Sequence, residues 1–204
     1  METGTTMRSQ PRADPRSSII GAGTAACRLY GPSKTNVVDI ARLLGRSPAS
    51  VYKIFPSKAA ILDAIATNFF ETDLHLPMHC NDKLNAADRL KEHALRQHRS
   101  MLEIRQGDRH MFDLVILAAE GSWASFGRHL KRLQAEVWEL VRTGIEAEEF
   151  APGNVDVAAS CFCTSVISLW DPRIVDAFPS SYWGISAQEL VSFAVGGLRQ
   201  VHTG

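Results

Sequence analysis

The amino-acid sequence predicts an all-α protein with an N-terminal three-helix helix-turn-helix head and a larger C-terminal helical body. Apolar residues recur at three- and four-residue spacing along most of the chain, and no alternating strand pattern is present. Glycine and proline separate the helical segments. The 204 residues can bury a sizeable core. We therefore divide the chain into an arm (1–15), a head (16–60) and a body (61–204).

The arm and the first helix differ sharply in composition. Residues 1–15 are rich in Thr, Ser, Arg and Pro, which is typical of a disordered, mildly basic segment. From Arg16 to Tyr30, small and apolar side chains follow helical spacing. Gly31-Pro32 then ends the helix, because proline cannot continue it.

Two short helices follow, with a glycine between them. The first is expected over 36–44, with Thr35 or Asn36 as its N-cap and Gly45 at its end. The second is expected over 48–54, because an N-cap serine followed by proline favours a helix start at Ser47-Pro48.

The rest of the chain also reads as helix. Ser57 is expected to cap a longer helix that runs to about Leu76. Beyond Pro77, apolar residues keep helical spacing in five further segments. These segments are 83–105, 108–119, 122–149, 154–170 and 186–202.

The two short helices have the pattern of a helix-turn-helix, which places its second helix in the DNA major groove. A helix of about seven residues is unstable alone and must pack on its neighbours. The residues expected to pack are Val37, Ile40, Ala41, Leu44, Val51 and Phe55. Those left for solvent or a partner are polar, basic and aromatic, which suits contact with phosphates and base edges: Arg46, Ser47, Ala49, Ser50, Tyr52 and Lys53.

The charge is unevenly distributed along the chain. The formal net charge is zero, with 22 basic and 22 acidic residues. Residues 1–60 contain nine Lys and Arg against three Asp and Glu, so that this part carries +6 and the remainder −6. A basic N-terminal unit on an acidic body is expected when only one part of a protein meets phosphates.

The head resembles the DNA-binding head of TetR-type (tetracycline-repressor-like) transcriptional regulators over residues 18–70. That family's pattern has a glycine after the first helix, then Thr-x-x-x-Asp-Ile-Ala-x-x-x-Gly and Ser-x-x-x-Leu/Val-Tyr-x-x-Phe-x-Ser-Lys. The matching residues are Gly31, Thr35, Asp39-Ile40-Ala41, Gly45, Ser47, Val51-Tyr52, Phe55 and Ser57-Lys58. The resemblance implies a repressor that binds a palindromic double-stranded DNA operator.

The resemblance also assigns roles to single residues. Thr35 and the amides of 36–38, Asn36 included, match phosphate contacts, and Tyr52 and Lys58 match residues that grip the DNA backbone. Ser47, Pro48, Ala49, Ser50 and Lys53 match the face that approaches base edges. The sequence departs from the family pattern at Cys27, Arg46, Ala49 and Ile54. Arg46 adds a charge within reach of phosphate, and the departures leave the operator sequence open.

For the body, the resemblance implies a homodimer formed by the last two helices and an effector pocket among the middle ones. Segments 154–170 and 186–202 carry few charges and many small or apolar residues, which suits close packing between subunits. An intramolecular core explains the same composition. The candidate interface residues are Ala158, Cys161, Leu169, Leu190, Phe193 and Gly197.

Aromatic, histidine and methionine side chains of the body are candidates for the wall of that pocket. The candidates are His93, His98, Met101, Phe112, Trp123, Phe126, Trp138, Phe162 and Trp170. Each is also suited to an ordinary core or surface position. Their weak charge favours an apolar or aromatic effector.

Other functions have less support in the sequence. His75, His79 and Cys80 do not form a convincing metal site, because Pro77 breaks the helix that would align them, and no cofactor is expected. Cys161 and Cys163 are expected to be buried thiols rather than a redox switch. An all-α enzyme or a helical adaptor with a vestigial head remain alternatives, although no catalytic motif supports an enzyme. The chain has no apolar run long enough to span a membrane, and the cytoplasm is the expected location.

Overall fold

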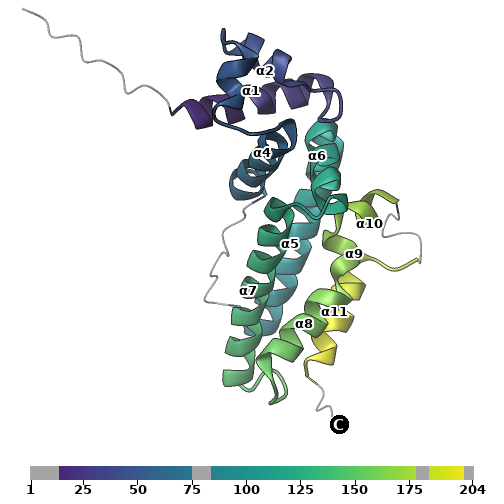
Figure 1. Cartoon of the computed structure of the whole chain (residues 1–204). Coiled ribbons are helices and arrows are strands. Elements are labelled where there is room, and N and C mark those ends of the chain that lie inside the picture. Colours follow the sequence, from purple (N-terminus) through teal and green to yellow (C-terminus); the bar gives the residue numbers. More distant parts are fainter. Residues whose placement is uncertain (1–13, 75–83, 178–183, 200–204) are drawn as a thin grey trace, which may run out of the picture.

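The computed structural model describes residues 14–74, 84–177 and 184–199, and these ranges contain helices and no strand (Figure 1). The prediction of an all-α fold is confirmed. The head contains α1 (Pro15–Tyr30), α2 (Val37–Leu43), α3 (Pro48–Tyr52) and the start of α4 (Lys58–Thr72). The body contains α5 (Ala86–Gly107), α6 (Arg109–Glu120), α7 (Ala124–Glu146), α8 (Val155–Ser165), α9 (Ile167–Trp170), α10 (Pro172–Ala177) and α11 (Ala187–Gly197). The expected arm, 1–15, lies almost wholly outside the described residues.

The helix starts in the head follow from their capping residues. Asn36, and not Thr35, caps α2, since its side-chain oxygen accepts a hydrogen bond from the Asp39 amide at 3.0 Å. Ser47 caps α3 and precedes a proline at the first helical position, as predicted. Ser57 caps α4 through the Ala60 amide at 3.1 Å. Each cap satisfies a backbone donor that the helix itself cannot pair.

The turn between α2 and α3 depends on a glycine. Gly45 has φ 61°, a left-handed conformation that a side chain would strain. The Arg46 amide donates back to the Ala41 carbonyl at 2.9 Å and so closes the end of α2. The turn therefore fixes the angle at which the chain enters α3.

The body differs from the sequence prediction at its C-terminal end. The helix expected over 154–170 is interrupted at Val166, which separates α8 from α9. Asp171 separates α9 from α10 and also caps α10: its carboxylate accepts from the Arg173 amide at 2.9 Å, and Pro172 occupies the first helical position. Arg105 and Arg109 then hold α10 by binding the Asp176 carboxylate at 3.1 and 2.7 Å.

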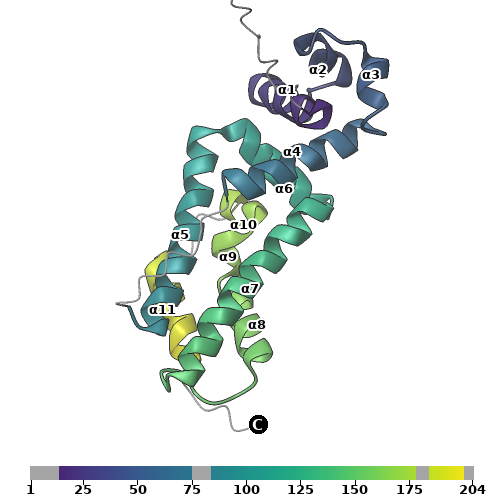
Figure 2. The same cartoon turned by 90° about the vertical axis from the view of Figure 1, so that its left-hand side faces the viewer.

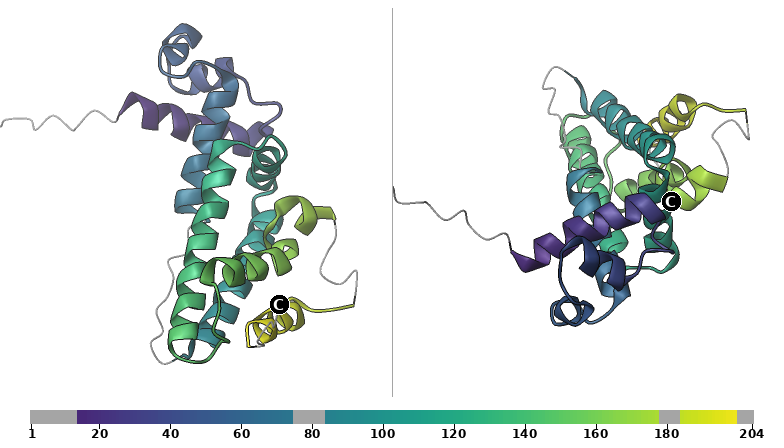
Figure 3. Two further views of the ribbon diagram at one scale, coloured as in Figure 1. Left: turned by 60° about the horizontal axis from the view of Figure 1, so that its bottom comes forward. Right: turned by 90° about the horizontal axis from the view of Figure 1, so that it is seen from above.

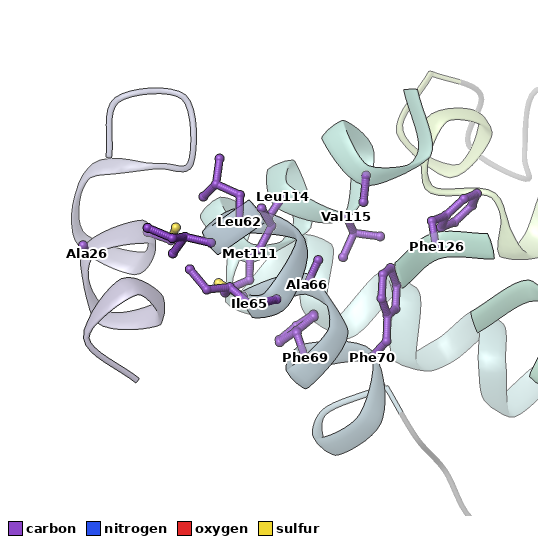
Figure 4. Close-up of a cluster of buried hydrophobic side chains, with 14 of the residues drawn as sticks. Ala26, Leu62, Ile65, Ala66, Phe69, Phe70, Met111, Leu114, Val115 and Phe126 are labelled. Carbon is purple, nitrogen blue, oxygen red and sulfur yellow. The ribbon is translucent and has the colours of Figure 1, made fainter. Parts of the chain in front are cut away.

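Helix α1 lies across the upper end of the body helices, which is clearest from above (Figure 3). One apolar core continues from the head into the body (Figure 4). It joins Ile19 and Ala26 of α1 to Ile65 of α4, Met111 of α6 and Phe126 of α7. The boundary that we set between residues 60 and 61 thus falls inside α4, and the core is continuous across it.

Polar contacts fasten the head to the corner between α5 and α6. The Arg28 guanidinium binds the carboxylate of Asp108 with an Nε–Oδ2 distance of 2.7 Å. The same Asp108 caps α6 by accepting from the Met111 amide. The His110 ring lies 2.7 Å from the carbonyl oxygen of Arg28, at the end of α1. The C-terminal end of α1 is therefore tied to the N-terminal end of α6.

A second set of polar contacts joins α4 to α7. The Asp63 carboxylate accepts from the Ser125 amide at 3.1 Å, where α7 begins without a side-chain cap of its own. One turn further along, Arg128 donates to the Thr67 hydroxyl at 2.7 Å. At the far end, Arg132 donates to the Phe70 carbonyl at 3.1 Å. Helix α4 is thus held along its length.

The lower half of the body has its own core between α5, α7, α8, α9 and α11. Phe150 follows α7 and folds back against that helix, where it is 4% exposed. Gly144 makes this possible, because a Cβ on it would lie 2.2 Å from the Phe150 ring and 3.1 Å from the Ala86 Cβ. The close approach requires a glycine at this position.

We predict that Gly144→Ala lowers the free energy of unfolding by about 1–3 kcal/mol, because the new methyl group must displace Phe150. Gly127→Ala is the matched control in the same helix, since nothing lies within 4 Å of its Cβ position. The control is expected to gain up to about 1 kcal/mol from helix propensity. Urea denaturation of both variants checks this, and equal stability would contradict the packing described.

The buried histidine His129 makes stability depend on pH. Its ring stacks on Phe70 with centroids 4.6 Å apart, and burial, aided by the Arg132 charge, lowers the pKa of His129 to about 3. Between about pH 6.5 and pH 4, the His129 ring is therefore protonated in the unfolded chain but neutral in the folded chain. The free energy of unfolding consequently falls as the pH falls. We predict a weaker pH dependence in His129→Leu, measured by urea denaturation across that range. If the free energy of unfolding changes with pH by the same amount in both proteins, this prediction is contradicted.

Candidate nucleic-acid interface

Helix α3 lies at the outer edge of the head (Figure 2). It has only five residues, so its position is fixed by packing rather than by its own stability. Val51 is fully buried, and Phe55 just beyond the helix is 1% exposed. Arg16 of α1 lies over the Phe55 ring, 4.3 Å from its centroid. The six residues predicted to pack the helix-turn-helix are buried, apart from the half-buried Leu44.

The opposite face of α3 and its flanks are open. Arg46, Ala49 and Lys53 are exposed, and the Tyr52 side chain is half exposed. Pro48 and Ser50 are half-buried. The structure therefore brings together on one surface the residues that the sequence predicts to approach base edges.

Ser47 belongs to the same surface, but its hydroxyl is partly engaged. Its oxygen accepts from the Ser50 amide at 3.3 Å and lies 2.9 Å from the Ser50 hydroxyl. A hydroxyl has one donor and two acceptor positions, so this pair can still bond outward. The two serines form one small polar unit at the start of α3.

The predicted phosphate contact from the Thr35 side chain is wrong. Thr35 is fully buried, and its hydroxyl donates to the Gly31 carbonyl at 2.8 Å. This bond closes the loop between α1 and α2, which leaves no polar atom of the side chain for DNA. The role of Thr35 is to hold the loop.

Asn36 and Lys58 are accessible, with side chains that also hold the fold. The Asn36 side-chain oxygen caps α2. The residue is exposed, so its side-chain NH2 group remains accessible. The Lys58 ammonium donates to the Ser33 carbonyl at 3.0 Å and is half-buried. An ammonium has three donors, so Lys58 can stabilise the loop and still face an anion.

Sequence reasoning missed exposed residues on α2. The Arg42 side chain is 73% exposed, and its ion pair with Asp39 spans 3.5 Å. Val38 and Leu43 are also more than half exposed. The positive charge of residues 1–60 already included Arg42, but the motif pattern did not single it out. These side chains extend the candidate interface from α3 onto α2.

The apolar candidates for an effector pocket are divided between the two apolar cores. Met101, Phe112 and Phe126 are buried in the core that continues into the head, and Trp123 packs against it. Phe162 and Trp170 are buried in the lower core, where Trp138 packs at the edge. Trp138 also donates to the Asp156 carboxylate at 2.8 Å. Most of these side chains have ordinary structural roles.

The two histidines among the candidates differ from the others. The His98 Nδ1 lies 3.0 Å from the Leu169 carbonyl, which accounts for one polar atom of this buried ring. His93 is 2% exposed, and neither of its ring nitrogens makes a hydrogen bond with the described part of the chain. Burial, together with the charge of Arg96, lowers the pKa of His93 to about 4, so the ring is neutral near pH 7.

A groove of about 360 Å³ lies between the C-terminal end of α7, α8 and α11. Its lining is mostly apolar and includes Val157, Phe162 and Phe193. Phe193 is 80% exposed and Val157 is 59% exposed, which is unusual for side chains of their size. This groove and the surrounding faces of α8 and α11 form an open apolar surface.

Four of the six candidate interface residues line this groove: Ala158, Cys161, Phe193 and Gly197. Leu190 is half-buried against the lower core. Leu169 is 2% exposed within the core of its own subunit, so its prediction as an interface residue is wrong.

The expectation of two buried thiols is also wrong for Cys161, which is exposed because α8 turns Ala159 and Phe162 toward the core instead. Cys163 is half-buried, and burial raises its pKa to about 11.

Two further expectations from the sequence concern a metal site and a membrane span. His75, His79 and Cys80 lie outside the described residues. Within the ranges that the structure covers, no group of three or more His, Cys, Asp or Glu is placed to hold a metal ion. None of the described helices is long and apolar enough to cross a bilayer.

Two family profiles match the sequence. Residues 19–65 match the profile described as "Bacterial regulatory proteins, tetR family". Residues 86–190, about half of the chain, match the profile described as "Tetracyclin repressor-like, C-terminal domain". The first match covers the helix-turn-helix, and the second covers most of the body. No curated protein matches the sequence.

Solved structures share the fold. A protein of unknown function from Rhodococcus sp. RHA1 is 18% identical, with a TM-score of 0.65 over 94% of this chain and 100% of that one. A transcriptional regulator from Cytophaga hutchinsonii is 20% identical, with a TM-score of 0.58 over 90% and 98%. The fatty acid degradation regulator FadR from Bacillus halodurans is 17% identical, with a TM-score of 0.57 over 95% and 99%. With its helix-turn-helix head and its matching body, the chain belongs to the tetracycline-repressor-like (TetR) family of DNA-binding transcriptional regulators.

Proposed function

We propose that the protein is a repressor that binds a palindromic operator as a homodimer and is controlled by a small molecule bound in its body. The observation that carries the proposal is the surface of α3, where Arg46, Ala49, Tyr52 and Lys53 are exposed on a packed helix-turn-helix. A guanidinium, an ammonium and a phenol suit contact with phosphates and base edges. The net charge of +6 in residues 1–60 favours such a partner.

The proposed dimer forms through α8 and α11. Phe193 and Val157 leave a large apolar area open beside the groove, and a second copy of the chain would bury it. A two-fold axis there would present two α3 helices to DNA, roughly 34–36 Å apart if they enter successive major grooves. Two heads on one symmetric site explain why a palindromic operator is expected.

Control by a ligand requires unequal affinity of that ligand for two arrangements of the heads. The polar contacts of the head with α6 and of α4 with α7 support such control, because a shift in the body can reach the head through them and through the shared apolar core. We propose that the effector lies among the middle helices of the body.

We predict two classes of head variant. Tyr52→Phe and Lys58→Ala remove contacts to the DNA backbone, so they should weaken binding to all sequences and lower the salt slope by about one for the lysine. Ser50→Ala and Lys53→Ala remove groups that face base edges, so they should change which operator variants bind. Fluorescence anisotropy with the DNA upstream of the protein's own coding region measures both effects.

Two outcomes of this experiment bear on different claims. If the wild-type protein shows no salt-sensitive binding to any such DNA, the proposed function fails. If the two classes of variant behave alike, the function stands but the assignment of residue roles is wrong. Glu71, which is exposed near the C-terminal end of α4, supplies the control: Glu71→Gln should leave binding unchanged.

We also predict that Phe193→Ser weakens the dimer without unfolding the subunit, because the side chain is exposed and contributes little to the core of its own chain. The loss is expected to be about 1–3 kcal/mol per removed side chain. Two side chains are removed per dimer, so the dissociation constant should rise by about 30-fold or more. Sedimentation equilibrium measures this constant. Leu29→Ser is the control, since Leu29 is 63% exposed but lies in α1, and an equal effect from both variants would exclude α11 as the interface.

A further inference from the structure

Several polar side chains of the long helices α5 and α7 are buried or half-buried in the interior of the body. The α5–α7 polar seam consists of His93 and Gln97 from α5 and of His129, Arg132 and Glu136 from α7. His93, Gln97 and His129 are buried, and the side chains of Arg132 and Glu136 are 25% and 16% exposed. Buried polar groups are costly unless each has a partner, so a seam of this kind needs an explanation.

His93 is the most deeply buried member of the seam. Its side chain is 1% exposed, and its Nε2 lies 3.6 Å from the Glu136 carboxylate, which is beyond hydrogen-bonding distance. The Trp170 ring packs edge-on against it, with centroids 6.2 Å apart. A neutral imidazole offers one donor and one acceptor, and within the described chain both lack a hydrogen bond.

Within the described residues, Arg132 also has a hydrogen-bond donor that lacks an acceptor. Its Nε is buried and makes no hydrogen bond within the described residues, and it lies 3.9 Å from Glu136. One terminal nitrogen is shared between the Phe70 carbonyl at 3.1 Å and His129 Nδ1 at 3.0 Å. A guanidinium binds a carboxylate best through two parallel hydrogen bonds, and Arg132 makes no such pair with Glu136.

The charges around the seam favour an anion. Arg96 lies close enough to His93 for its charge to bear on the ring, and its Nε is likewise buried with no hydrogen bond in the described chain. Arg96 and Arg132 each carry a positive charge and a buried Nε that makes no hydrogen bond within the described chain. A carboxylate supplies both a negative charge and hydrogen-bond acceptors.

We propose that the α5–α7 polar seam is the site that receives the carboxylate of the effector, with Arg132 and His93 donating to its oxygens. This inference rests on the proposed control by a small molecule and gives that molecule a chemical class, namely an apolar or aromatic carboxylic acid. Trp170 beside His93 and Phe70 beside His129 supply apolar surface for the remainder of the molecule.

The same geometry links the ligand to the head. Arg132 holds the C-terminal end of α4 through the Phe70 carbonyl. A carboxylate that engages the guanidinium in a bidentate pair competes with that carbonyl for the same donors. Ligand binding then releases one end of α4, and α4 leads directly into the helix-turn-helix.

The test uses the full-length protein with three acids (benzoate, phenylacetate and hexanoate) and the corresponding primary amides. Intrinsic tryptophan fluorescence reports binding, since Trp170 lies beside His93. We expect saturable binding of at least one acid, about tenfold or more tighter than its amide, because a charge-assisted hydrogen bond contributes more than a neutral one. Equal binding of acid and amide, or no saturable binding by any acid, overturns the proposal.

Arg132→Met and the matched control Arg128→Met locate the site. Arg128 lies one turn away on α7 and donates to the Thr67 hydroxyl at the surface, so it contacts α4 without belonging to the seam. We expect the preference for the acid to disappear in Arg132→Met and to persist in Arg128→Met. Arg132→Lys, which keeps the charge but not the planar guanidinium, provides a milder variant if Arg132→Met does not fold. Unchanged acid binding in the folded Arg132 variants overturns the proposal.

Anisotropy measurements on operator DNA separate this inference from the proposed function. If the protein binds DNA and no acid alters that binding, the assignment of the seam fails while the DNA-binding function stands. If an acid binds with the expected dependence on Arg132 but the protein binds no DNA, the seam stands as a carboxylate site and the repressor function fails.

Discussion

The burial of α4 on two sides is the constraint on which the rest of the structure depends. On the head side, Ile65 packs so tightly against α1 that a Cβ at Gly23 would lie 2.6 Å from its terminal carbon. On the body side, Phe70 stacks on His129, and Asp63 binds the start of α7. Because protein interiors are close-packed, α4 cannot shift against one partner without disturbing the other.

This constraint follows from the size of the head. Helices of five and seven residues are not stable in isolation, and together with the 16-residue α1 they form a unit too small to bury much apolar surface by itself. The head therefore completes its apolar core with side chains of the body, namely Met111 of α6 and Phe126 of α7. Its orientation is consequently a property of the whole chain, which is the physical requirement for control from a distance.

Local signals in the sequence were sufficient for the head and insufficient for the body. Caps, glycine turns and helical spacing are short-range. They placed the caps Ser47 and Ser57 correctly and left the cap of α2 between Thr35 and Asn36. Burial depends on distant partners, so the sequence could not tell that the Thr35 hydroxyl turns inward to Gly31 or that Leu169 packs within its own subunit. For the same reason, the sequence did not show that the helix expected over 154–170 is interrupted at Val166.

Local sequence signals could not identify the residues of the polar seam either. His93 was one of nine similar candidates in the sequence, and nothing local distinguished it from Phe112 or Trp138. Arg132 was not among the candidates, although its Nε is buried and its guanidinium reaches Phe70 and His129. Packing of α5 and α7 against each other and against α4 and α9 determines which polar side chains are buried, and this packing is not encoded at short range.

Hydrogen exchange across a urea titration tests most directly whether the head and the body form one structural unit. The comparison is between the amides of Val37–Tyr52 in the head and those of α7 in the body. A shared core predicts that the slowest-exchanging amides of both regions open together, with the same urea dependence. If the head amides open at distinctly lower urea while α7 remains protected, then α4 does not couple the two regions as described.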